Sequence, residues 1–350
     1  MKILSTILLS ALAATSAMAG GDKPIDGLSY SLPKTAVRMQ VLVEKTVTEP
    51  GQLAGFSQLY FGKAGVSTRQ TAYRIVGVSF SSEGRADADR QYTVAIDKKH
   101  SIISVDCAPD GSLLAINTKA QRAKAPAAFV PSPRKAALNP RDYMSQDILS
   151  AGNLPKMAQL VAQEIYDIRD SRSQLSRGEA DFMPKDGEQL RLMYSQLATQ
   201  EAALMQLFQG KTTVDTTATV LSFVPTKENL RPVVFRFSKS FGLCSADDYS
   251  GDPVYANIED TGASKPLPET PAEVAKMKDD FNLGVARPGH IRITLATAEG
   301  KPLGYYDTDA AQFGTVEKLN GALFGKKFTS HIILDPATGG VVELKTEPLD

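Results

Sequence analysis

Two stretches of helical periodicity, flanked on both sides by strand-like sequence, constrain the fold most. Between Pro155 and about Ser176, and again between Leu190 and Phe208, apolar residues recur every three or four positions, which is typical of a helix with one apolar face. The two apolar stripes are Ala158, Val161, Ile165, Ile168 and Leu175, then Leu190, Met193, Leu197, Leu204 and Phe208. Glycines and a proline interrupt the pattern at 178–187. The sequence predicts an antiparallel helical hairpin within residues 141–210, whose apolar stripes require a further surface to cover them.

Residues 20–119 have the pattern of an N-terminal β-rich domain. Val37, Met39, Val41 and Val43 occupy alternate positions, as in a half-buried strand, and further strand-like runs cover 72–78 and 92–96. Between these runs, residues 53–60 carry apolar positions at helical spacing, which predicts a short helix ending at Gly62.

Residues 120–140 are rich in proline and alanine. Pro126, Pro131, Pro133 and Pro140 cannot continue a helix or a central strand. We therefore expect an extended surface linker between the β-rich sequence and the helical hairpin.

Residues 211–350 return to strand-like sequence, with runs at 219–224, 232–239, 290–296 and 330–334. Thr270-Pro271-Ala272-Glu273 has the form of a capping box and predicts a short helix near 271–280. The predicted fold class is therefore α+β, with two antiparallel β-rich portions and an inserted antiparallel helical hairpin.

The two β-rich portions contain a candidate internal repeat. Residues 92–117 align with 233–258 without a gap, and each segment has a strand, an acidic glycine-containing turn and a second strand. A true duplication and the shared periodicity of any two hairpins both explain the match.

The first nineteen residues have the pattern of a secretory signal peptide. Lys2 precedes an apolar run from Ile3 to Ala14, and Ala17-Met18-Ala19 supplies the small residues that signal peptidase recognises. The apolar run is shorter than the roughly 20 residues that a membrane-spanning helix needs. We expect cleavage after Ala19, a mature chain without a membrane span, and a periplasmic or secreted location.

Composition limits the classes of partner. Lys plus Arg and Asp plus Glu both number 39, so the chain lacks the strongly basic field that collects nucleic acid. In an oxidising compartment Cys107 and Cys244 could form a disulfide, although two buried thiols are the alternative.

Signatures of catalytic chemistry are sparse. The three histidines are widely spaced, no His-Glu-x-x-His or Gly-x-Ser-x-Gly motif occurs, and we assign no catalytic, cofactor-binding or metal-ligating set. Acidic residues of the first predicted helix, Glu164, Asp167 and Asp170, have the spacing of helix ion pairs with Arg169 and Arg172 on a solvated face.

Two segments are candidate interaction sites. The turn 247–252 concentrates carboxylates and one aromatic ring, through Asp247, Asp248, Tyr249 and Asp252. In the second segment, Gln312 and Phe313 place an aromatic ring between polar and small residues, which suggests exposure.

Several short motifs resemble a family of exported proteins from Bacteroides-like bacteria, known only as a domain of unknown function. They are Ser29-Tyr30-Ser31-Leu32-Pro33-Lys34-Thr35, Tyr73-Arg74-Ile75-Val76, Pro184-x-Asp186-Gly187, Leu207-Phe208-x-Gly210-Lys211 and Ala311-Gln312-Phe313-Gly314-x-Val316. The resemblance covers nearly the whole mature chain. It implies a single full-length unit in the cell envelope and assigns no role to any residue.

Two functional hypotheses remain open. The first is a non-enzymatic envelope protein that binds another protein or a cell-surface polymer. The alternative is a periplasmic hydrolase that acts on envelope glycan or peptide through two carboxylates brought together in space. A large cavity with two carboxylates of shifted pKa would favour the hydrolase. An open sheet edge or an exposed apolar patch would favour the binding protein.

Overall fold

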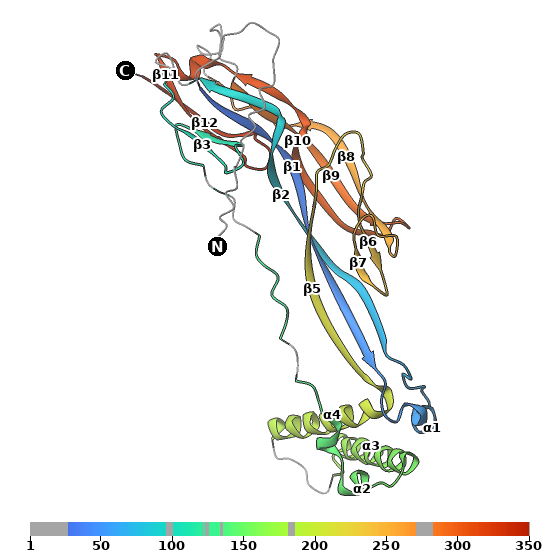
Figure 1. The fold of residues 1–350 in the computed structure, drawn as a ribbon. Helices are drawn as coiled ribbons and strands as arrows, with labels where there is room; N and C mark the ends of the chain where they lie inside the picture. Colours follow the sequence, from blue (N-terminus) through green and yellow to red (C-terminus); the bar gives the residue numbers. More distant parts are fainter. Residues whose placement is uncertain are drawn as a thin grey trace, which may run out of the picture.

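The computed structural model describes residues 27–95, 101–120, 122, 126–133, 136–180, 186–270 and 283–349. These residues form an elongated molecule with a helical module at one end (Figure 1). Of its three antiparallel sheets, one has long strands that reach this module, and the other two lie farther from it. The predicted signal peptide at 1–19, the first part of the β-rich domain up to residue 26 and the predicted helix near 271–280 lie outside the described residues.

A long three-stranded sheet forms the central support of the molecule. It has the order β2-β1-β5, with β2 at Gln70–Ala95, β1 at Gly27–Glu49 and β5 at Lys211–Phe223. The alternation predicted for β1 is confirmed, because Val37, Met39, Val41 and Val43 are all buried. Their common face is the core face of this sheet.

A five-stranded sheet packs against that core face. Its order is β10 (Pro302–Leu319), β9 (Leu283–Thr297), β8 (Asp252–Ser264), β6 (Val233–Ser238) and β7 (Gly242–Cys244). Apolar side chains of β1, β6, β8 and β9 interdigitate in one cluster, as in a β-sandwich, and include Phe235, Val254, Ile291 and Ile293.

A four-stranded sheet covers the end of the sandwich farthest from the helices. Its order is β12 (Val341–Pro348), β11 (Phe328–Leu334), β4 (Leu113–Ile116) and β3 (Val105–Cys107), and the short helix η3 (Gly321–Phe324) packs beside it. Leu113, Phe324 and Ile332 share a buried cluster there with Leu32 of β1.

The sheets combine strands from both sides of the helical insertion. β1 pairs with β5, and β4 pairs with β11, so the two β-rich portions of the sequence are interleaved in space. The hypothesis of an internal duplication is wrong. β6 pairs with both β7 and β8, whereas β3 pairs with β4, and the end of β2 pairs with β1. The two segments share only the periodicity of hairpins.

The predicted helical hairpin is present as α3 (Leu154–Arg177) and α4 (Gly187–Gln209). The side chains of Asn153 and Asp186 cap the two helix N-termini, and Gly178 ends α3 in the left-handed region. Two shorter helices, η2 (Pro140–Tyr143) and α2 (Gln146–Leu149), precede the pair.

The β1–β2 connection supplies the further surface that the hairpin requires. This connection forms η1 (Ala54–Phe56) and α1 (Ser57–Phe61), with Gly62 at its predicted end. Leu53 and Phe208 are fully buried in the cluster that joins this connection to α3 and α4. The connection also bonds to α4 directly, because Leu53 N donates to Leu207 O at 2.7 Å.

The described parts of the predicted linker are 120, 122, 126–133 and 136–140. They are mostly exposed and form no helix or strand, except that Pro140 begins η2. In Figure 1 this stretch runs from the four-stranded sheet to the helical module alongside the long strands.

Candidate functional site

The outer face of the three-stranded sheet is polar. Because side chains alternate along a strand, Arg38 and Gln40 of β1 lie opposite the core face. Arg38 is paired with Ser81 of β2 and Ser222 of β5, and Gln40 with Ser79 and Val220. The sequence pattern that buries one face of β1 therefore presents hydroxyl, amide and guanidinium groups on the other.

Two adjoining hollows lie on this outer face. The larger, about 550 Å³, lies between β1, β2, the β3–β4 turn and the turn at 335–337. The smaller, about 300 Å³, lies farther along the sheet beneath residues 126–129. Arg38, Ser81 and Pro126 line both hollows, so they form one continuous groove.

Three carboxylates line the larger hollow, and each is engaged by the protein itself. Asp110 accepts hydrogen bonds from Ser112 N at 3.1 Å and Ala86 N at 2.9 Å. Asp335 Oδ1 accepts from the backbone amides of the turn that follows it, at 2.8 and 2.9 Å. Glu83 accepts from Arg85 at 2.7 Å. The groove therefore offers no pair of unengaged carboxylates among these three.

The pKa shift of Asp110 also argues against a catalytic role for the carboxylates of this hollow. Desolvation raises the pKa of this carboxyl, but the hydrogen bonds from Ser112 and Ala86 outweigh it and hold the pKa below its usual value. A general acid for glycoside hydrolysis needs a raised pKa, so the shift of Asp110 is in the wrong direction for that role.

The outer edge of the same sheet is open at β5. Within the described residues, this thirteen-residue strand pairs with β1 on one side and with no strand on the other. Its register with β1 runs from Lys211 to Phe223 without a shift. Val214 and Val220 of β5 are 51% and 46% exposed. β5 thus presents a long regular row of backbone donors and acceptors beside exposed apolar side chains.

The acidic turn predicted as an interaction site is held by its own side chains. Asp248 accepts from Ser250 N at 3.0 Å and Ser250 Oγ at 2.6 Å, and these bonds hold its pKa below the usual value. Arg236 of β6 donates to Ala246 O and Gly251 O, at 2.9 and 3.2 Å. Asp247 is exposed in the turn, and Asp252 begins β8 opposite Phe237.

This acidic turn presents an aromatic ring to solvent. The Arg236 guanidinium carbon lies 4.3 Å from the centroid of the Tyr249 ring, and Tyr249 is 83% exposed. Tyr249 is therefore an exposed ring whose orientation is fixed by Arg236 at the surface of the five-stranded sheet.

The predicted exposure of Phe313 is wrong. Phe313 is only 5% exposed and lies in the core between the two sheets of the sandwich. The register of β10 shifts between Ala310 and Thr315, and this bulge turns Phe313 inward. Gln312 of the same bulge bonds to the backbone of Thr35 and Pro225. Both residues join the sheets and do not form a free surface.

The candidate disulfide is not formed. Cys107 and Cys244 are both free and lie on edge strands of different sheets, β3 and β7. The Cys244 thiol lies 3.7 Å from Gly242 O and 3.6 Å from Ser250 Oγ. Desolvation, assisted by Asp106, raises the pKa of the Cys107 thiol. The cysteines therefore have the environments of structural thiols.

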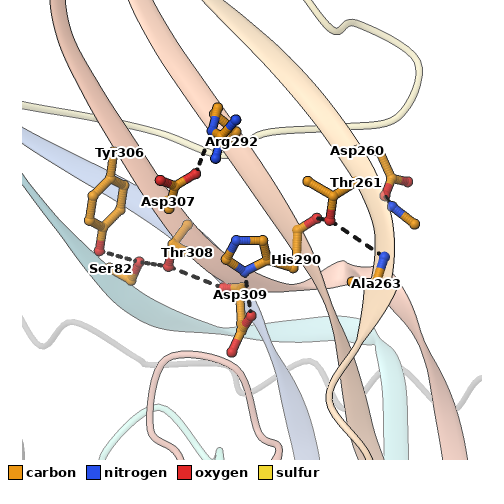
Figure 2. A network of polar contacts seen from close by, with 11 residues as sticks. Ser82, Asp260, Thr261, Ala263, His290, Arg292, Tyr306, Asp307, Thr308 and Asp309 are labelled. Atoms are coloured by element: carbon orange, nitrogen blue, oxygen red, sulfur yellow. Dashed lines mark hydrogen bonds and ion pairs between the residues drawn. The ribbon is translucent and has the colours of Figure 1, made fainter.

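A polar network that sequence reasoning missed covers β9 and β10 (Figure 2). His290 Nδ1 lies 2.9 Å from Asp309 Oδ1, and Arg292 Nε donates to Asp307 at 2.8 Å. Each pair is directly opposite in the β9–β10 register, which the sequence alone does not reveal. Such polar cross-strand pairs stabilise the sheet.

Ser82 of β2 lies in the same region. Its Oγ lies 2.9 Å from Tyr306 Oη and 2.8 Å from Thr308 Oγ1, as Figure 2 shows. This hydroxyl cluster joins β2 to β10. Over the described residues, no group of three or more His, Cys, Asp and Glu side chains could hold a metal ion.

Comparison with known proteins gives one match. A family model described as "Domain of unknown function (DUF4831)" matches residues 26–342. No curated protein and no solved structure matches the chain. In the part of the chain that the structure describes, no helix is long and apolar enough to cross a membrane.

Proposed function

The chain belongs to the DUF4831 family, and we propose that it is an exported interaction protein that binds an extended segment of another envelope protein along β5. The open edge of β5 carries this proposal. An extended peptide that adds a strand there gains main-chain hydrogen bonds along the strand, and side-chain contacts at alternate positions give specificity.

The chemistry of β5 favours a peptide as the partner. Natural edge strands are usually short, bulged or protected by charges and prolines. β5 is long, its register is unbroken, and its sequence KTTVDTTATVLSF has no proline and only two charged residues. A polymer without a regular row of amide groups could not use these backbone donors and acceptors.

The groove beside the edge extends the proposed surface. Val220 lines the smaller hollow and also belongs to β5, so the groove reaches the strand whose open edge would pair with the peptide. The carboxylates of the larger hollow, engaged with backbone amides and Arg85, do not support the alternative of a hydrolase.

A pull-down from envelope extract tests the proposal. Tagged chain from Gly20 onward is compared with the double variant Val214→Lys/Val220→Lys, which places charges on the exposed face of β5. The matched control is Val76→Lys on β2, the opposite edge strand, where Val76 is also partly exposed. Thermal unfolding verifies that the variants fold.

We expect the unmodified chain and the control to retain a partner protein, and the β5 variant to retain at least tenfold less of it. The added charges should block strand pairing, as lysines on natural edge strands do. Hydrogen exchange of the β5 amides should slow when the identified partner binds. A partner that the β5 variant retains fully, or retention of glycan alone, contradicts the proposal.

A further inference from the structure

The helical module lies at the opposite end of the molecule from the four-stranded sheet (Figure 1). A further hollow lies in this module. It has a volume of about 430 Å³. Its lining residues come from α3 and α4 and are Arg169, Arg172, Ser173, Ser176, Arg177, Tyr194 and Glu201.

The arginines of this hollow do not make the ion pairs expected along α3. Arg169 Nε donates to Glu201 Oε1 of α4 at 2.7 Å, and Arg172 donates to the other oxygen of the same carboxylate. Asp167 and Asp170 instead accept from glutamine side chains one turn away. The guanidinium groups are therefore drawn between the helices, where they line the hollow.

The lining carries excess positive charge. Three arginines and one glutamate give it a formal net charge of +2. Arg177 has a further partner in Glu179, at 2.7 Å, but both side chains are more than half exposed, so solvent screens this pair. The hollow is thus an electropositive concavity with hydroxyl groups on its wall.

The guanidinium groups are held in place before any ligand arrives. The Arg169 guanidinium carbon lies 5.4 Å from the Phe61 ring centroid and 5.8 Å from that of Tyr166. Arg169 and Arg172 each engage Glu201 through one nitrogen, and Arg169 Nη2 also lies 3.9 Å from Met205 Sδ. Each guanidinium group keeps further donors for a ligand. Such preorganisation lowers the entropic cost of binding an anion.

We propose that this hollow binds the phosphate group of a phosphate monoester. A phosphate monoester carries a charge of about −1.5 to −2 at neutral pH, which matches the excess charge of the lining. Its oxygens accept hydrogen bonds from several directions, and the three guanidinium groups of α3 and the hydroxyls of Ser173 and Ser176 can supply them. The volume exceeds that of the anion, and Tyr194 provides a wall for the organic part. This site is independent of the β5 edge proposed above.

Titration of the full mature chain with glycerol phosphate, inorganic phosphate and glycerol tests the inference. The readouts are calorimetry and the backbone amide NMR signals of Ser173 and Ser176. We expect saturable binding of glycerol phosphate with shifts at these amides, weakening with added salt, and no binding of glycerol. Tighter binding of the ester than of inorganic phosphate would identify an esterified ligand; equal binding would identify the free anion.

Substitutions separate this site from general attraction to a basic surface. Arg177→Gln, at an exposed position, and Arg172→Gln should each weaken binding about tenfold, the worth of a charge-assisted hydrogen bond. The control Arg191→Gln removes an exposed arginine of α4 outside the lining and should leave the affinity unchanged. No saturable binding, or equal effects of all three substitutions, overturns the inference. The β5 variant should bind glycerol phosphate normally, so the two proposals fail independently.

Discussion

Gln312 and Thr35 form a reciprocal pair that joins the two sheets of the sandwich. Gln312 Oε1 accepts from Thr35 N at 3.0 Å, and Gln312 Nε2 donates to Thr35 O at 2.9 Å. The same Nε2 donates to Pro225 O, just after β5, at 2.8 Å. One amide side chain in the β10 bulge thus replaces ladder hydrogen bonds for β1 and fixes the chain leaving β5.

The substitution Gln312→Ala should lower the free energy of unfolding by about 2–4 kcal/mol, because it leaves buried backbone groups without partners. Urea unfolding measures this change. The control Gln196→Ala, at an exposed position on α4, should change it by less than about 0.5 kcal/mol. Equal stabilities of the two variants would contradict the structural role of Gln312.

The two aromatic residues of the predicted interaction sites should behave oppositely. Phe313→Ala removes a buried ring and should cost about 3–5 kcal/mol of unfolding free energy. Tyr249→Ala removes an exposed ring stacked on Arg236, and its effect should stay below about 1 kcal/mol. Thermal unfolding distinguishes them, and a melting temperature lowered more by Tyr249→Ala would exclude the observed packing of β10.

Sequence reasoning succeeds for the regular elements and fails at Phe313. The periodicities of β1, α3 and α4 were sufficient, because each element buries one face over several turns or residue pairs, which in α4 is its C-terminal part from Ala203 to Phe208. The segment around Phe313 violates the period at a bulge, and whether a ring there points inward depends on the register with β9, a long-range property.

The pairing between strands that are distant in the sequence could not be predicted either. The sequence indicated strands on both sides of the helical hairpin but not that β1 pairs with β5. Consequently neither the open edge of β5 nor the groove beside it could be predicted. The arginine-lined hollow was missed for a related reason, since helix spacing suggests pairs within α3 whereas Arg169 and Arg172 reach Glu201 on α4.

The cysteines give a prediction about covalent state. Intact mass after alkylation in denaturant, without reductant, should show two modified thiols, because both are free. In the native protein, alkylation of Cys107 should be slow at neutral pH and accelerate as pH rises toward its raised pKa, because the thiolate is the reactive form. Cys244 is buried and should react more slowly still. Failure to alkylate either thiol in denaturant would contradict the two free cysteines.

The lowered pKa of Asp110 predicts acid sensitivity at the β3–β4 turn. Because its folded-state pKa lies below the unfolded value, its contribution to stability is full above about pH 4 and is lost as pH falls through the folded pKa. Asp110→Asn should lower the melting temperature at pH 7. The difference in melting temperature between this variant and the wild type should be smaller near pH 3. The side chain is exposed, so the effect should be small. A difference that grows in acid would contradict the assigned hydrogen bonds.

The last prediction concerns the junction between the helical module and the long sheet. Gly210 links α4 to β5 with φ of 86°, and a Cβ there would lie 2.2 Å from Glu49 O. Gly210→Ala should therefore lower the free energy of unfolding by at least about 1–3 kcal/mol, because the positive φ and the nearby Glu49 oxygen both disfavour a side chain at this position. Gly152→Ala, where a Cβ meets nothing within 4 Å, is the matched control and should be nearly neutral. In the Gly210→Ala variant, the amides of α4 and of the start of β5 should be the first to lose protection from hydrogen exchange. If those amides keep their protection in Gly210→Ala, the close approach of β1 to this junction is wrong.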